Sequence, residues 1–150
     1  MIPKGSEAIR HLVTRIAMDL MPKATDAYTA TDLGLFTALL GLVAQDYDRA
    51  AEVLVTEHAA ILPLLRQAAA HLDDGALKAR IADVSAAPET SLRISALSAR
   101  SDAAMKVLID VHAAVEEAGA HGAAWAPALD SEIWRFLEAH VVAHSYESAL

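Results

Sequence analysis

The sequence contains no cysteine, and this absence removes several kinds of site at once. Disulfide bonds, thiolate nucleophiles and cysteine-based zinc or iron–sulfur centres are excluded, because each of them needs the sulfur atom of this residue. Any metal ion bound by this chain would have to be held by histidine and carboxylate side chains.

Lysine and arginine are scarce relative to acidic residues. Twelve basic side chains stand against twenty acidic ones, which gives a formal net charge of −8, and no cluster of Lys or Arg stands out. Nucleic-acid binding depends on neutralising backbone phosphates with such side chains. We therefore expect no nucleic-acid partner.

Long apolar runs are absent as well. The longest uncharged one, LGLFTALLGLVA, covers residues 33–44 and lies between Asp32 and Asp46. It is shorter than the roughly 20 residues that cross a bilayer, so the sequence predicts a buried helix and no membrane span. The N-terminal residues lack the apolar region and cleavage site of a signal peptide, which leads us to expect a cytoplasmic location.

Motifs for phosphate binding and nucleophilic catalysis are also missing. Among only six glycines, neither G-x-x-x-x-G-K-[ST] nor G-x-G-x-x-G occurs, and no serine lies in a G-x-S-x-G turn. An enzyme that uses its histidines as acid–base groups is the weakest functional hypothesis, because no nucleophile or oxyanion device accompanies them. We therefore expect a protein that is not an enzyme.

The chain is rich in alanine and in apolar residues with helical spacing. The apolar fraction is 55%, whereas aromatic residues make up 5%, and no segment alternates in the manner of a β-strand. The sequence predicts an all-α fold in which residues 1–150 form a single domain. Its architecture should be an antiparallel helical bundle of about five main helices plus one short helix.

The first two helices are predicted from capping residues and from apolar positions three or four residues apart. The first should begin at Ser6 and stop at Pro22, and the second should begin at Thr29 or Thr31. The second helix is apolar around most of its circumference, which is typical of a central or interface helix.

A third helix should follow after a break at residues 45–48. One helix from Thr31 to Leu72 would extend about 60 Å. A compact domain of this length has a gyration radius of only about 15 Å. Pro63 lies where the apolar line continues through it, so it should kink this helix rather than end it.

The remaining helices are delimited by turn residues. Residues 73–75 should end the third helix and precede a short amphipathic one, and the longest helix should run from Pro88 to Gly119. Asp130 or Ser131 should begin the last helix after a loop.

Four of the seven histidines fall on the apolar faces of the predicted helices: His58, His112, His140 and His144. Each could be a core or interface histidine whose ring nitrogens find a hydrogen-bond partner. Imidazole is also the commonest metal ligand, and residues four apart on a helix can reach the same ion. Together with Glu116 and Glu147, each about one turn from a histidine, they form the predicted ligand set for a divalent metal.

The order of two motifs, His112-x-x-x-Glu116 followed by His140-x-x-x-His144, resembles that of hemerythrin-like di-iron bundles, in which an HxxxE helix precedes an HxxxH helix. The resemblance covers only these residues. That family needs a further His and Asp on a later helix, for which the sequence to Leu150 has no counterpart. The Glu-x-x-His pair of ferritin-like bundles is also absent. The motif order therefore does not assign the chain to either family.

Two functions from different classes remain. The first is a non-catalytic bundle that self-associates, at least as a dimer, or binds a protein partner, because covering residues 33–44 on all sides requires more helices than one such chain supplies. The second is a bundle that holds a metal or small ligand between inward-facing histidines. Metal analysis of the purified protein distinguishes the two.

Overall fold

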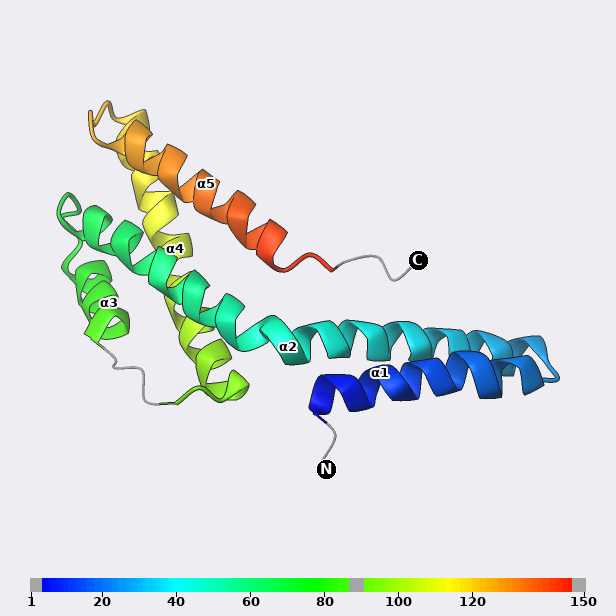
Figure 1. Ribbon diagram of the computed structural model, residues 1–150. Coiled ribbons are helices and arrows are strands. Elements are labelled where there is room, and N and C mark those ends of the chain that lie inside the picture. The colour runs from blue at the N-terminus through cyan, green and yellow to red at the C-terminus, as the bar shows by residue number, and fades with distance from the viewer. Residues whose placement is uncertain (1–3, 87–90, 147–150) are drawn as a thin grey trace. The chain divides into compact units, whose positions relative to one another are not determined.

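The computed structural model describes residues 4–86 and 91–146 (Figure 1). Five α-helices and no strand occur in these two ranges, which confirms the predicted all-α fold. The antiparallel arrangement of the whole bundle stays a prediction. Packing contacts divide the described chain into two compact units, one containing residues 4–50 with Tyr146 and the other residues 51–145.

The first unit is a helical hairpin. Helix α1 (Gly5–Arg15) continues through a π-helical turn (Ile16–Leu20) and a 3-10 turn (Met21–Lys23), so the helical chain ends one residue beyond Pro22. The first part of α2 (Ala27–Ala69) then runs back beside α1 (Figure 1). At the start of α1, a Cβ atom on Gly5 would overlap the ring of Tyr47, so the two helices approach closely there.

The caps of the hairpin differ from those predicted. Helix α1 begins at Gly5 after Lys4, so Ser6 is not its cap. Asp26, rather than either threonine, caps α2, because its Oδ1 accepts the backbone N–H of Thr29 at 2.8 Å and its Oδ2 accepts the Thr29 hydroxyl at 2.7 Å. These hydrogen bonds lower the pKa of Asp26 below its ordinary value.

Helix α2 runs without interruption over 43 residues, so the predicted break at residues 45–48 is wrong. The expectation of a break assumes that every helix fits around one compact core. In the structure, residues 27–50 of α2 belong to the hairpin and residues 51–69 to the second unit, so the length of α2 is not limited by one core. Pro63 lies inside α2 and does not end it, as predicted.

The second unit contains the hydrophobic core. Residues 51–69 of α2 contribute to it together with α3 (Gly75–Ala86), α4 (Ile94–Ala120) and α5 (Ala126–Ala143). Helix α4 packs against both α3 and α5. The largest fully buried side chains all lie here: Ile61, Leu65, Leu108, Val111, Val115, Leu129 and Ile133. Burial of such side chains is the main stabilising contribution to a unit of this kind.

Asp74 begins α3. Its Oδ1 accepts the backbone N–H of Ala76 at 2.8 Å and that of Leu77 at 3.0 Å, which satisfies donors that have no partner inside the helix. The stop predicted at residues 73–75 is therefore also the start signal of the next helix.

Helix α4 begins at Ile94 rather than at Pro88, and it is shorter than α2. Pro88 itself lies outside the described residues. At the other end, Gly122 adopts a φ of +83°. The N–H of Gly122 bonds to the carbonyl of Gly119, and the N–H of Ala123 bonds to that of Ala118. This pattern of two backbone bonds ends helices where glycine follows them.

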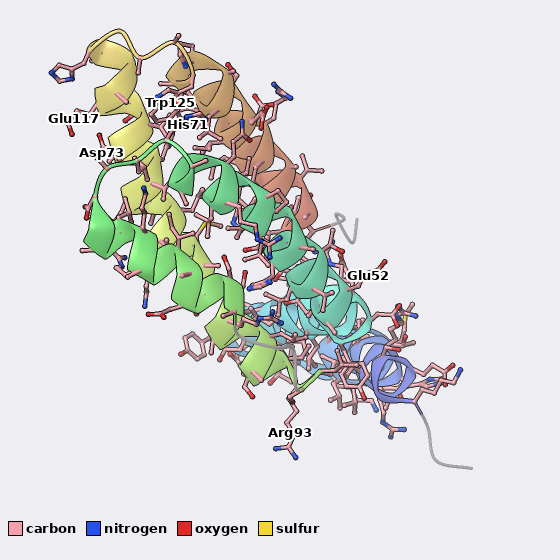
Figure 2. The ribbon with its side chains drawn as sticks, turned by 90° about the vertical axis from the view of Figure 1, so that its left-hand side faces the viewer. Glu52, His71, Asp73, Arg93, Glu117 and Trp125 are labelled. Atoms are coloured by element: carbon pink, nitrogen blue, oxygen red, sulfur yellow. The ribbon has the colours of Figure 1, made fainter. Side chains whose placement is uncertain are left out.

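Helix α5 begins earlier than predicted. Its first residue is Ala126, so neither Asp130 nor Ser131 is the cap. Pro127 lies in the first turn, where the missing N–H of proline costs no hydrogen bond. The loop before it brings Trp125 against His71, whose rings stack at a centroid distance of 4.8 Å with an interplanar angle of 9° (Figure 2). This stack joins the loops that follow α2 and α4.

Candidate metal centre

The structure separates the predicted metal ligands into two clusters. His140 and His144 lie together with Glu57, which was not among the predicted ligands, whereas His112 and Glu116 lie with Asp130. The metal hypothesis requires His140 and His144 to lie within one ion's reach of His112 or His58, and the structure groups them with neither. The remaining two predicted ligands, His58 and Glu147, belong to neither cluster: His58 is buried on α2, and Glu147 lies outside the described residues.

Helix α2 and the end of α5 bring the first cluster together, and α4 adds a serine beside it. Glu57 lies on α2 one turn before the core residue Ile61, so it occupies the inner face of its helix and its exposure is only 9%. His140 and His144 lie one turn apart near the end of α5, and Ser101 lies on α4. Glu57, His140, His144 and Ser101 all belong to the second unit. We call Glu57, His140 and His144 the Glu–His–His cluster.

The two oxygens of Glu57 have different partners. Oε1 accepts a hydrogen bond from the hydroxyl of Ser101 at 2.7 Å. Oε2 lies 2.8 Å from Nε2 of His144 and 3.3 Å from Nδ1 of His140. The two imidazole rings are close neighbours as well, with a centroid distance of 4.4 Å. One carboxylate oxygen thus faces two ring nitrogens, while the other is held by a serine.

The Nδ1 atom of His140 is buried and makes no hydrogen bond to any described residue, although it faces Oε2 of Glu57. Buried polar atoms are nearly always hydrogen-bonded, because leaving one without a partner costs about 1–3 kcal/mol. In the tautomer that leaves a lone pair on this nitrogen, the carboxylate oxygen cannot be its partner, and a bound cation would be one. Bound metal ions are ligands of this kind for neutral imidazole.

The electrostatics of the cluster favour a charged carboxylate. Burial by itself raises the pKa of Glu57. The hydrogen bonds from His144 and Ser101, together with the charges that His140 and His144 carry when protonated, outweigh burial and hold the pKa of Glu57 below its ordinary value. Glu57 is therefore ionised at neutral pH and available as an anionic ligand.

A groove of about 290 Å³ lies beside the cluster, between α2 and α5. Glu57 and His140 form part of its wall, and the exposed Glu52, labelled in Figure 2, lies on its α2 side. The other lining residues are mostly apolar and small: Val53, Thr56, Ala60, Phe136, Ala139 and Ala143. The groove leaves one side of the cluster accessible to a small molecule or to water.

The second cluster is more open. Nε2 of His112 lies 2.8 Å from Oδ1 of Asp130 and 3.9 Å from Oε1 of Glu116, whose side chain is 60% exposed. The edge of the His112 ring contacts Trp134, at a centroid distance of 5.4 Å. A hydrogen-bonded histidine–aspartate pair between α4 and α5 accounts for this geometry, so we regard the Glu–His–His cluster as the stronger metal site.

Two acidic residues of these clusters, Glu57 and Asp130, were not predicted as ligands, although the sequence carries a signal for each. Glu57 precedes Ile61 by four residues, so the helical period that assigned His58 to an apolar face also puts Glu57 next to that face. Asp130 was interpreted as a possible helix cap. Proline is favoured in the first turn of a helix, so Pro127 indicates an earlier start of α5, and Asp130 then lies inside this helix.

Comparisons with protein-family models, with curated proteins and with solved structures found no match to this chain. Any function must therefore be inferred from the geometry of the described residues.

Proposed function

We propose that this protein binds a divalent transition-metal ion through Glu57, His140 and His144. The observation that carries the proposal is the convergence of three potential ligand atoms, all within 4.8 Å of one another, at a buried carboxylate beside a groove. Two imidazoles and one carboxylate form a ligand set that is common in metal sites with an open coordination position.

The distances between the potential ligand atoms are compatible with a divalent transition-metal ion. With bond lengths of about 2.0–2.1 Å, ligand atoms in tetrahedral geometry lie about 3.4 Å apart. Oε2 of Glu57 is 3.3 Å from Nδ1 of His140, which already matches this value. It is 2.8 Å from Nε2 of His144, so this pair has to separate by about half an ångström. The two histidine side chains are 31% and 44% exposed, so neither is enclosed by its neighbours.

Ser101 orients the carboxylate of Glu57. Its hydroxyl holds Oε1 of Glu57, which leaves Oε2 directed at the two histidines. Hydrogen bonds of this kind fix ligating carboxylates, and their loss typically weakens metal binding by about 10- to 100-fold. The groove would admit a water molecule or a small ligand to the remaining coordination position.

Metal titration tests the proposal. The purified protein is freed of metal with a chelator and titrated with Zn²⁺ by calorimetry and with Co²⁺ by visible absorption at neutral pH. We expect one ion per chain, with an affinity that falls by more than about 10-fold in His144→Ala and in Glu57→Gln. Binding should weaken as the pH is lowered, because protons compete with the metal for the ligand atoms.

Two variants serve as controls. His121→Ala removes an exposed histidine outside both clusters and should leave the affinity unchanged. His112→Ala tests the second cluster directly. The proposal is wrong if the wild-type protein binds no metal at millimolar concentration, or if His112→Ala abolishes binding while His144→Ala does not.

A further inference from the structure

The helical hairpin of the first unit exposes a broad apolar face on α2. Its large side chains are between 49% and 78% exposed: Tyr28, Leu35, Phe36, Leu39, Val43 and Tyr47. At about 100° per residue, these six positions fall within an arc of about 120° around the helix axis. We call this set of residues the α2 face.

The hairpin has almost no core of its own. Ala44 is the only residue that is fully buried in the described part of this unit, and α1 contains none. Ala44 lies on the side of α2 opposite the middle of the α2 face, at an angle of more than about 100° from Leu39. Two helices that bury so little are not stable on their own in water, because most helical stability comes from packing of an apolar face.

The area of the α2 face matches that of a dimer interface. An aromatic side chain has about 150–250 Å² of surface and an aliphatic one less, so six large side chains that are about half-exposed present at most about 600 Å². The largest apolar patch of a typical monomer is about 300–600 Å². A stable interface buries about 800 Å² per partner, of which about 65% is apolar in homodimers, or about 500 Å².

From these observations we propose that the hairpin pairs with the hairpin of a second copy of this chain through the α2 face, forming a four-helix arrangement. A two-fold interface is formed by the same surface on both copies, so one self-complementary apolar face is sufficient. Pairs of helical hairpins form four-helix bundles by this type of packing.

The charges of the hairpin are complementary between its two helices. Residues 4–23 carry four basic and two acidic side chains, whereas residues 26–50 carry four Asp and one Arg. In a pair of hairpins, the basic α1 segment of one copy and the acidic residues of α2 in the other copy attract each other. Asp32 and Asp46 lie within the same arc as the α2 face. Asp46 accepts a hydrogen bond from the Tyr146 hydroxyl at 2.8 Å, whereas Asp32 requires a basic side chain of the other copy to offset its charge in the proposed pair.

A lipid bilayer is the competing occupant. Helix α2 is long and apolar enough to cross a membrane by length and composition alone, and 6% of its most apolar window is buried. The core helix of a soluble protein meets the same criterion of length and composition, but such a helix is mostly buried. Burial of Asp32 in hydrocarbon is unfavourable, and the formal net charge of −8 opposes binding to anionic lipid surfaces. These charges favour the second copy.

The mass in solution tests the proposal. Light scattering and sedimentation of the full chain, with chelator present so that metal plays no part, should give twice the chain mass of 15.9 kDa at micromolar concentration. The double change Leu35→Glu with Leu39→Glu should weaken the dimer by at least about 100-fold, because it buries two charges per copy. Ile109→Glu, at a 63% exposed apolar residue of α4, is the matched control and should remain dimeric.

Cross-linking gives a second measurement that does not depend on a destabilising change. Since the chain has no cysteine, single cysteines introduced at residues 35, 36, 39 or 43 are the only thiols present. At least one of these four variants should form an intermolecular disulfide rapidly under mild oxidation, and Ile109→Cys should not.

Three results would overturn the proposal. They are a monomeric wild-type protein at 100 micromolar, a dimer that survives the double change to Glu with its helix content intact, and a monomer that co-sediments with phosphatidylcholine vesicles. Because chelator is present throughout, none of these results bears on the proposed metal site. Loss of metal binding in Glu57→Gln likewise leaves this proposal unaffected.

Discussion

Replacement of Glu57 by Gln is the most informative single change, because it removes a buried charge and keeps the shape of the side chain. In the wild-type protein, Glu57 accepts hydrogen bonds from Ser101 at 2.7 Å and from His144 at 2.8 Å. The Gln amide can still accept one of these bonds through its oxygen. Its NH₂ group, however, presents donors to a site that is already occupied by donors.

The expected cost is set by these contacts. Hydrogen bonds to charged groups contribute about 1.5–3 kcal/mol each and neutral ones about 0.5–1.5 kcal/mol, so the bond that Gln keeps weakens by about 1 kcal/mol. The other bond is lost, which costs about 1–3 kcal/mol. The attraction between Glu57 and protonated His140 and His144 adds little, because these rings are 31% and 44% exposed and solvent screens them. We therefore expect the free energy of unfolding to fall by about 2–4 kcal/mol.

The pH dependence has a defined sign. The pKa of Glu57 is lower in the folded protein than in the unfolded chain, where it is about 4.3. The stability that its charge provides is therefore fully present above about pH 4.3 and is lost as the pH falls through the lowered folded-state pKa. The difference between wild type and variant should be constant from pH 7 to pH 5 and disappear in strong acid.

Urea unfolding followed by circular dichroism, with chelator present, measures this difference between pH 7 and pH 3. Glu52→Gln is the matched control, since Glu52 lies on the same helix beside the same groove and is exposed. Its effect should stay within about 0.5 kcal/mol. An unchanged stability of Glu57→Gln at pH 7, or a difference that persists undiminished at pH 3, would refute the reasoning.

Three further comparisons test the fold. Leu108→Ala, at a residue that is 2% exposed, should lower the free energy of unfolding in urea by about 2–5 kcal/mol, whereas Ile109→Ala, at a 63% exposed position, should change it by less than about 1 kcal/mol. Asp74→Ala removes the cap of α3 and should cost about 1 kcal/mol in the same assay. Gly122→Ala should destabilise the protein by about 1–2 kcal/mol, because Gly122 has a positive φ. Gly34→Ala should stabilise α2 by about 1 kcal/mol, because a Cβ atom there meets no neighbour within 4 Å. Thermal midpoints measure both effects. Equal effects of the two members of a pair would contradict the environments described for them.

The sequence by itself determined the helical nature of the chain and most of the core faces of the second unit. The burial predicted for residues 33–44 is not found, because only Ala44 among them is buried. These properties are local: apolar residues recur with the helical period, and glycine and aspartate mark the ends of helices through bonds to nearby backbone groups. Asp74 and Gly122 act within five residues of their own positions. The spacing of His140 and His144 by one turn, which makes them neighbours on α5, is local in the same sense.

The tertiary structure decided how far α2 runs and which groups meet. Continuity through residues 45–48 depends on whether the two halves of α2 pack in one unit or in two, and no local spacing encodes that choice. The ligand set has the same origin, because Glu57 precedes Ser101 by 44 residues and His144 by 87. Contacts at such separations form only when whole helix faces are buried against one another, and several pairings of amphipathic helices bury similar apolar areas. Periodicity could therefore direct these side chains inward, but only the packing of α2, α4 and α5 in the second unit placed them around one carboxylate.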